Sequence, residues 1–279
     1  MVRSKQQAAA KLIDAIDAAA EKAAREDKRR KKAKRSPETI RALMRSAPER
    51  FFDYCQLMAP DFYSPDRRYL VELCDELQAF AEDPYQQVLI INLPPRHGKS
   101  RTACLFCQWL FGKNPSEKIM SGSYNEMLSA TFSKNIRNAI QEEKLDSDKI
   151  VYADVFPYTK IQTGDAAAHY WTIAGEYSSY LATSPTGTAT GFGCSFMVID
   201  DIIKNSYEAN NEIILDQHWE WFTNTMLSRL EEGGKIIIIM TRWNSKDLAG
   251  RATALFGDRA KVISMETPLP RSEEHTSEL

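Results

Sequence analysis

The stretch VLIINLPPRHGKS, residues 88–100, decides the fold. Residues 87–92 form a continuous apolar run typical of a strand buried on both faces, and a helix is expected from about residue 99 to residue 111. Between them lies a short loop that ends in Gly-Lys-Ser. This order lets backbone N–H groups and a helix N-terminus face a polyphosphate. The stretch therefore predicts a phosphate-binding loop.

This loop is predicted to supply the nucleotide contacts, which are Pro95, Arg96, His97, Gly98, Lys99, Ser100 and Arg101. Lys99 is expected to reach the β- and γ-phosphates of ATP, and the Ser100 hydroxyl is expected to ligate Mg²⁺. The usual pattern has a glycine five residues before Gly98, where this chain has Leu93. The alternative is a surface turn that happens to contain a lysine.

Two adjacent acids follow another apolar strand, expected at residues 195–199. Asp200 is predicted to bind Mg²⁺, directly or through water, and Asp201 to polarise the attacking water. Such sites form at the carboxyl edge of a parallel sheet. The alternative is a strand end with exposed acids, and the upstream phosphate-binding loop favours the catalytic interpretation.

A further strand, residues 236–240, ends in Thr241-Arg242-Trp243. A polar residue at this strand end can sense the γ-phosphate and transmit its loss to a neighbouring element. Thr241 and Arg242 are therefore the predicted coupling residues, with an ordinary turn as the alternative.

Two arginines flank the phosphate-binding loop, and either could offset charge on the transferred phosphoryl group. Arg96 is the preferred candidate. The alternative for Arg101 is that it is simply a solvent-facing residue in the first turn of the helix. Arg96 thus joins Lys99 and Asp201 as a predicted catalytic residue. His97 is predicted to shape the loop rather than to take part in the chemistry.

Strands and helices alternate along most of the chain. Amphipathic helices are expected at 38–57 and 66–81, before the loop, and a further helix at 125–142. The remaining strands are expected at 118–121, 235–240 and 260–264. Strands apolar on both faces predict an α/β fold with a mostly parallel sheet covered by helices.

Composition excludes several classes of protein. The chain has 279 residues, of which 43% are hydrophobic and 27% charged, as in an ordinary globular protein. No apolar run reaches the length of about 18 residues that a membrane span needs, and no signal peptide is expected. The five cysteines show no scaffold pattern, which indicates a reducing compartment, and Cys104-x-x-Cys107 is predicted to be two small core residues rather than a zinc or redox motif.

Charge divides the chain unevenly. Residues 1–35 have a net charge of +7 and the remaining residues a net charge of −9. An alanine-rich helix is expected at 6–24, followed by a basic run that either is a solvated tail or contacts nucleic-acid phosphates. Ser36-Pro37 is the predicted boundary of this arm.

The last nine residues, 271–279, resemble a translated sequencing adapter. The natural reading frame is therefore expected to end near Pro270 in a truncated fragment. The predicted organisation is a basic helical arm (1–36), a helical lead-in (37–84), an ATPase domain (85–270) and an adapter-derived tail (271–279).

With these motifs in place, the chain resembles the large terminase subunit of tailed bacteriophages. Four segments carry the resemblance: Leu93 to Ser100, Ser123 to Asn125, Gly187 to Asp201 with its Thr190-Gly191-x-Gly193 turn, and Thr241 to Gly250. Loops without the first glycine are usual in that family. The resemblance spans about residues 50–266. One departure is that many family members carry glutamate where this chain has Asp201.

The resemblance implies a P-loop NTPase of the additional-strand, RecA-like type, with sheet order 5-1-4-3-2. It implies an ATPase that uses Mg²⁺ and translocates double-stranded DNA into a prohead. The implied partners are DNA, a portal protein, a small terminase subunit and further copies in a ring, with no membrane. The implied location is the host cytoplasm, transiently at the portal and not in the mature virion.

The family's second half is a metal-dependent nuclease, and no corresponding acid cluster follows residue 270. This chain is therefore expected not to cut DNA. Two alternatives stay open at this stage. One is a helicase-like translocase with the same core, and the other is a non-enzymatic subunit that docks DNA or a small subunit and has a vestigial ATP site.

Overall fold

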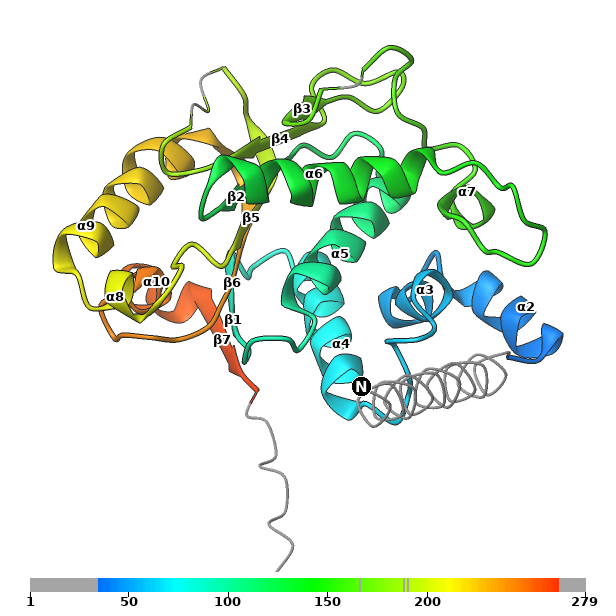
Figure 1. Cartoon of the computed structure of the whole chain (residues 1–279), viewed down its shortest axis with the longest axis horizontal. Coiled ribbons are helices and arrows are strands. Elements are labelled where there is room, and N and C mark those ends of the chain that lie inside the picture. Colours follow the sequence, from blue (N-terminus) through cyan, green and yellow to red (C-terminus); the bar gives the residue numbers. More distant parts are fainter. Residues whose placement is uncertain (1–34, 166, 188, 190, 266–279) are drawn as a thin grey trace, which may run out of the picture.

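A seven-stranded sheet organises the chain (Figure 1). The structure is a computed structural model, and it describes residues 35–165, 167–187, 189 and 191–265. In spatial order, the strands are β3 (Tyr170–Trp171), β4 (Tyr180–Thr183), β2 (Ile119–Ser123), β5 (Cys194–Asp200), β6 (Leu230–Met240), β1 (Val88–Asn92) and β7 (Ala260–Ser264).

The parallel core of this sheet has the predicted order. If β1, β2, β5, β6 and β7 are counted as strands 1 to 5 along the chain, they lie in the order 5-1-4-3-2. All neighbouring pairs among them are parallel. On the far side of β2, β4 adds a parallel strand and β3 an antiparallel one. The α/β prediction with a mostly parallel sheet is therefore confirmed.

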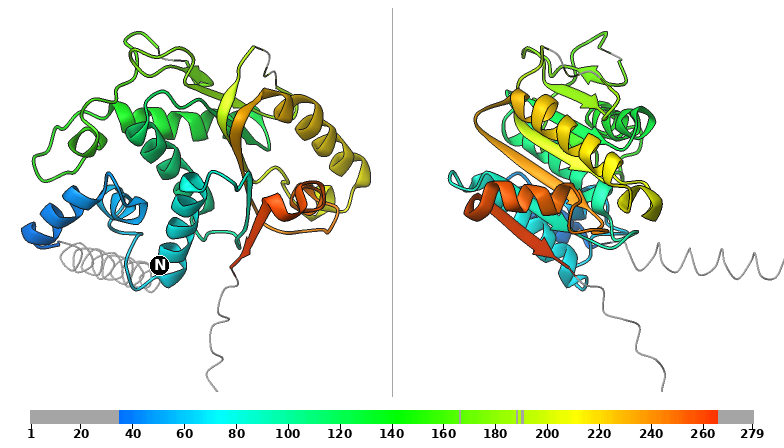
Figure 2. Two further views of the ribbon diagram at one scale, coloured as in Figure 1. Left: turned by 180° about the vertical axis from the view of Figure 1, so that it is seen from behind. Right: turned by 90° about the vertical axis from the view of Figure 1, so that its left-hand side faces the viewer.

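Helices cover both faces of the sheet, which Figure 1 shows nearly edge-on. One side, named here the first face, carries α2 (Pro37–Ser46), α3 (Phe51–Met58), α4 (Arg68–Glu82), α5 (Lys99–Lys113), α6 (Glu126–Gln141) and α7 (Tyr152–Val155). The other side, the second face, carries α8 (Ser206–Ala209), α9 (Glu212–Glu220) and α10 (Leu248–Phe256), and α9 and α10 lie in front of the sheet in the right-hand view of Figure 2. Three further helical segments are not α-helices. They are the π-helix η1 (Trp221–Met226) and the 3₁₀ turns η2 (Leu227–Arg229) and η3 (Gly257–Arg259).

Strand β1 shows why the sheet needs cover on both sides. Leu89 and Ile91 lie in the core of the first face, whereas Val88 and Ile90 lie in the core of the second. All four side chains are fully buried. Alternate residues of a strand point to opposite faces, so a continuous apolar run demands helices on each side.

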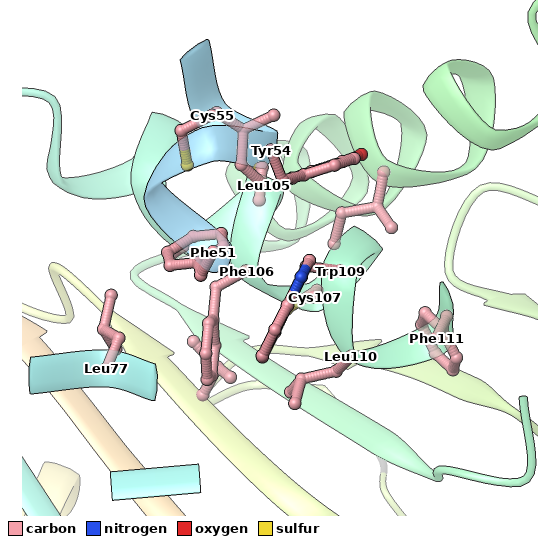
Figure 3. Packing of buried hydrophobic residues seen from close by; sticks show 14 of the residues in the cluster. Phe51, Tyr54, Cys55, Leu77, Leu105, Phe106, Cys107, Trp109, Leu110 and Phe111 are labelled. Atoms are coloured by element: carbon pink, nitrogen blue, oxygen red, sulfur yellow. The ribbon is translucent and has the colours of Figure 1, made fainter. Parts of the chain in front are cut away.

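The core of the first face is rich in aromatic rings (Figure 3). Phe51 of α3 packs edge-on against Phe106 of α5, with ring centroids 5.1 Å apart, and Phe106 stacks beside Trp109. The Trp109 indole donates a hydrogen bond to the Ala47 carbonyl, 3.0 Å away. The helices before β1 therefore share one core with the helix that follows the phosphate-binding loop.

The expected elements differ from the structure in two respects. The single helix predicted at 38–57 is wrong, because α2 and α3 are separate and Pro48 lies between them. Proline lacks the N–H that a continuous helix would need, and its ring collides with the preceding turn. The helices of the second face, the short helix α7 and strands β3 and β4 were not predicted. The helix expected at 6–24 and the tail at 271–279 lie outside the described residues.

Within the ranges that the structure describes, no helix combines the length and the apolar character that crossing a membrane requires.

Candidate active site

The phosphate-binding loop joins β1 to α5 at the carboxyl edge of the sheet. Gly98 precedes the helix with a φ of 84°, in the left-handed region that glycine adopts without strain. A side chain at this position would also collide with the Phe62 ring, 2.5 Å from the place of a Cβ. Both the backbone conformation and the close approach of Phe62 therefore require glycine at this position.

Lys99 connects the carboxyl ends of neighbouring strands. Its side chain is 6% exposed, and its Nζ lies 2.8 and 2.7 Å from the two carboxylate oxygens of Asp201. The same Nζ donates to the Thr241 hydroxyl at 2.6 Å, and the Thr241 N–H donates to Asp201 at 3.1 Å. The structure thus brings the predicted lysine, the second acid and the predicted coupling residue into one hydrogen-bonded group.

Asp200 lies beside this group but has a different environment. It is buried, and one of its carboxylate oxygens, Oδ1, has no hydrogen-bond partner within the described part of the chain. Burial raises the pKa of Asp200 to about 7, while a hydrogen bond from Ser100 opposes the shift.

The surroundings of Asp200 fit a magnesium ion. Hard divalent cations prefer carboxylate and hydroxyl oxygens, and Asp200 and Ser100 present both at one point. A cation there would satisfy the unpaired Oδ1 and offset the cost of burying the charge. Among the described residues, no group of three or more His, Cys, Asp or Glu side chains is arranged to hold a metal.

Asp201 has a backbone conformation unusual for a residue other than glycine. Its φ is 41°, and its N–H donates to the Ile239 carbonyl at 3.0 Å. The chain turns sharply here, so the Asp201 side chain is 40% exposed although its neighbour Asp200 is buried. Strained residues of this kind are concentrated at functional sites. Two adjacent acids thus have separate environments.

A cavity of about 600 Å³ opens beside the two acids, and it is named here the active-site cavity. It lies between α5 and α6 and is lined by Met58, Ala59, Ser100, Arg101, Cys104, Leu105, Gln108, Ser123, Leu128, Thr131, Phe132, Asn135, Asp200 and Asp201. Its lining is mixed: the two acids lie at the sheet edge, and α5 and α6 contribute both polar and apolar side chains.

The arginines beside the loop differ in their surroundings. Arg96 is exposed and has a φ of 65°. Arg101 forms an ion pair with Asp61 at 3.3 Å and lies over the Phe62 ring. Of the two, Arg96 therefore has the less restrained position.

Two other sequence predictions concern structural roles near the loop. His97 Nδ1 hydrogen-bonds the Pro95 carbonyl at 2.9 Å, as a loop-shaping residue would. Cys104 and Cys107 are both buried free thiols in α5, and burial raises the pKa of Cys104 well above its ordinary value. Both therefore have the surroundings of core residues.

The loop after β6 depends on one carboxylate that the sequence reasoning did not single out. Asp247 is fully buried and accepts hydrogen bonds from the Arg242 guanidinium at 3.2 Å and from the backbone N–H groups of Trp243, Asn244 and Gly250. It fixes the loop that carries Thr241. The available signal was its position as an N-cap residue directly before α10.

The fold and the geometry at the sheet edge together define an α/β fold of the P-loop NTPase type. A solved structure with a similar fold is the large terminase of bacteriophage HK97, at a TM-score of 0.51 and 14% sequence identity. The match covers 79% of this chain and 44% of the HK97 chain, so this chain corresponds to less than half of that protein. The likeness supports the sequence resemblance to the ATPase portion of large terminases, at the level of the fold.

Comparisons with protein-family models and with curated proteins found no match. The roles of the individual site residues therefore remain predictions from the motifs and the geometry.

Proposed function

We propose that this chain is the ATP-hydrolysing motor domain of a phage large terminase subunit, which translocates double-stranded DNA into a prohead. The observation that carries the proposal is the meeting of Lys99, Asp201 and Thr241 at one sheet edge, beside Ser100 and Asp200. A polyphosphate-binding loop, a buried carboxylate and an exposed carboxylate are the parts that ATP hydrolysis needs.

In this proposal Lys99 changes partners when ATP binds. In the structure its ammonium is neutralised by Asp201 and held by Thr241. The β- and γ-phosphates would give Lys99 a stronger anionic partner, because they carry more charge than one carboxylate. Asp201 would then be released to orient and polarise the attacking water.

The other residues would hold and neutralise the phosphates. The N–H groups at the start of α5 would bind phosphate oxygens, and Ser100 and Asp200 would hold Mg²⁺, which offsets charge on the β- and γ-phosphates. Arg96 would stabilise charge on the transferred group. Loss of the γ-phosphate would be sensed by Thr241, which shares Lys99 with Asp201.

The implied partners and location belong to the same proposal. They are duplex DNA, a portal protein, a small terminase subunit and other copies of the chain in a ring, in the cytoplasm of an infected bacterium. The HK97 likeness supports this assignment only through the fold.

The test is ATP turnover by the chain in the presence of linear duplex DNA. Lys99→Ala is expected to lower turnover at least 100-fold, because it removes the charge that holds the β- and γ-phosphates. Lys113→Ala is the matched control, since Lys113 lies at the other end of α5 and pairs with Glu49 at the surface. Asp201→Asn is expected to bind ATP and not hydrolyse it.

Equal turnover in Lys99→Ala and the wild type would exclude this site. Strand separation of a partial duplex would instead favour a helicase. A wild-type chain that fails to bind Mg²⁺-ATP would favour the docking alternative.

A further inference from the structure

A second cavity, of about 690 Å³, lies on the opposite side of the end of β2. It is named here the polar cavity, and it is lined by Tyr124, Asn125, Pro185, Thr186, Gly187, Gln217, His218, Glu220, Trp221, Asn224 and Thr225. These residues follow β2 and β4 or belong to α9 and η1. Amides and hydroxyls predominate, and Glu220 is the acidic side chain among them.

Two buried groups of this cavity lack hydrogen-bond partners. Trp221 is 6% exposed and His218 is 8% exposed, and neither Trp221 Nε1 nor His218 Nδ1 has a partner among the residues that the structure describes. Buried polar groups of native proteins are almost always paired with protein, water or a ligand. Burial lowers the pKa of His218, so its imidazole is neutral near pH 7. The cavity therefore presents unused, uncharged hydrogen-bonding capacity.

The backbone at this wall is itself unusual. Residues 221–226 form a π-helix that continues directly from α9. Such segments are rare and occur frequently at functional sites. Here the π-helix places Trp221, Asn224 and Thr225 on the wall of the cavity, together with Gln217 and His218 of α9. Local geometry and unpaired groups thus indicate a binding site independently of each other.

The two aromatic rings of the cavity each contact another part of the protein. The Trp221 ring packs on β2 so closely that a Cβ at Gly122 would lie 2.6 Å from it. Lys204 lies over the Tyr124 ring, with its Nζ 5.4 Å from the centroid. Both rings therefore already have a protein contact, and the amide and hydroxyl groups are the more numerous groups of the lining. Sugar and phosphate oxygens accept hydrogen bonds from such groups in many protein–DNA contacts.

We propose that the polar cavity binds the sugar–phosphate backbone of duplex DNA, a contact that rests on the motor function proposed above. The contact is made by uncharged donors, with Lys204 as the neighbouring cation. Its contribution to affinity therefore depends little on salt, unlike contacts that release counterions.

The polar cavity is also joined to the active site. Ser123 lines the active-site cavity, and the next two residues, Tyr124 and Asn125, line the polar cavity. The two sites therefore share the end of β2 as a common wall.

A second connection runs through the loop after Thr241. Asn244 donates to the Ala209 carbonyl at 3.0 Å, Lys246 pairs with Glu212 at 2.6 Å, and Arg251 of α10 pairs with Asp216 at 2.6 Å. These contacts tie the loop and α10 to α8 and α9, and α9 continues into the wall of the polar cavity. DNA affinity is therefore expected to differ between the ATP-analogue and ADP states.

The test measures binding of labelled duplex DNA by fluorescence anisotropy, with a non-hydrolysable ATP analogue present. The double variant Asn224→Ala/Thr225→Val is expected to weaken binding about 3- to 10-fold, and Trp221→Phe by a similar factor. The same factor is expected at 50 and 200 mM salt. Gln162→Ala/Thr163→Val is the matched control, because this exposed amide and hydroxyl pair lines neither cavity.

A photo-crosslinking residue at position 224 locates the contact directly. It is expected to crosslink to duplex DNA, whereas the same residue at position 158, where Tyr158 is 95% exposed, is not. The combination of weaker binding, unchanged binding of the ATP analogue and crosslinking at 224 supports the proposal.

Four results overturn it. The first is unchanged duplex affinity in both variants. The second is a larger loss for single-stranded than for duplex DNA, which would indicate contacts to bases. The third is loss of ATP-analogue binding in the same variants, which would place the effect in the active site. A chain that hydrolyses ATP but does not bind duplex DNA also overturns the inference, and it leaves ATP hydrolysis standing.

Discussion

The two faces of the sheet differ in whether the polar atoms of their buried aromatic side chains have hydrogen-bond partners. On the first face, the polar atoms of these rings are paired: Tyr54 with Gln108, Tyr63 with Thr102, Trp109 with Ala47, Trp171 with Ser133 and Tyr180 with Ser121. On the second face, Trp221 and His218 are also buried, but Trp221 Nε1 and His218 Nδ1 have no partner among the described residues. Polar pairing is therefore complete for these rings of the first face and incomplete at two positions of the second.

A substitution at Asp247 tests whether the second face tolerates unpaired polar groups throughout or only at the polar cavity. Asp247→Ala is expected to destabilise the chain by about 2–4 kcal/mol, because three backbone N–H groups and Arg242 lose their acceptor. Urea unfolding measures the change. Asp258→Ala, at an exposed acid, is the control, with an expected change within about 0.5 kcal/mol. A small effect at Asp247 would mean that this face tolerates unpaired groups generally.

The same substitution at two tryptophans compares the faces directly. Trp109→Phe is expected to cost about 1–2 kcal/mol more than Trp221→Phe, because it alone breaks a hydrogen bond and leaves the Ala47 carbonyl unpaired. Both substitutions replace an indole by the smaller phenyl ring. The difference between their unfolding free energies therefore reports the hydrogen bond of Trp109. The measurement is urea unfolding without DNA. Equal costs would show that Trp221 has a partner in the free protein.

A smaller effect is expected at the far end of the first face. Tyr180→Phe removes the bond of 2.6 Å to the Ser121 hydroxyl and is expected to cost about 1 kcal/mol. Tyr177→Phe is the control, because Tyr177 is 87% exposed. Thermal or urea unfolding distinguishes the two. No difference between them would contradict the view that polar pairing stabilises this face.

The smallest effect concerns pH. Burial lowers the pKa of His218, with Glu208 opposing the shift, so the unfolded chain takes up this proton at a higher pH than the folded chain. Stability is therefore expected to fall as the pH drops below the unfolded value of about 6.5, until the folded protein is protonated as well. His218→Gln should lack this part of the pH dependence between pH 5 and 8. Identical pH profiles would show that His218 is not shielded from solvent.

The sequence predicted the parallel core well, since its signals are local. The apolar strand at 88–92, the Gly-Lys-Ser loop and the two acids after β5 each lie in a few consecutive residues. Because parallel strands end at one edge, these motifs were expected to meet, and the structure places Lys99, Asp201 and Thr241 in contact.

The second face was poorly predicted because its signals are weak or depend on tertiary contacts. Helix α8 has four residues, and the π-helix follows α9 without a break in the sequence pattern. The different environments of Asp200 and Asp201 follow from a backbone turn with positive φ, which no propensity of aspartate indicates. The buried position of Asp247 likewise depends on how the loop after β6 folds back on α10.

The cover that Phe62 forms over Gly98 has a consequence for cooperativity. Because Phe62 belongs to the segment between α3 and α4, and because those helices share their core with α5, the phosphate-binding loop cannot open independently of them. In amide hydrogen exchange, the start of α5 and the preceding helices would then show the same protection factors, because they open together as a single unfolding unit. Any fragment beginning at residue 85 would expose this core and lose the support that shapes the loop.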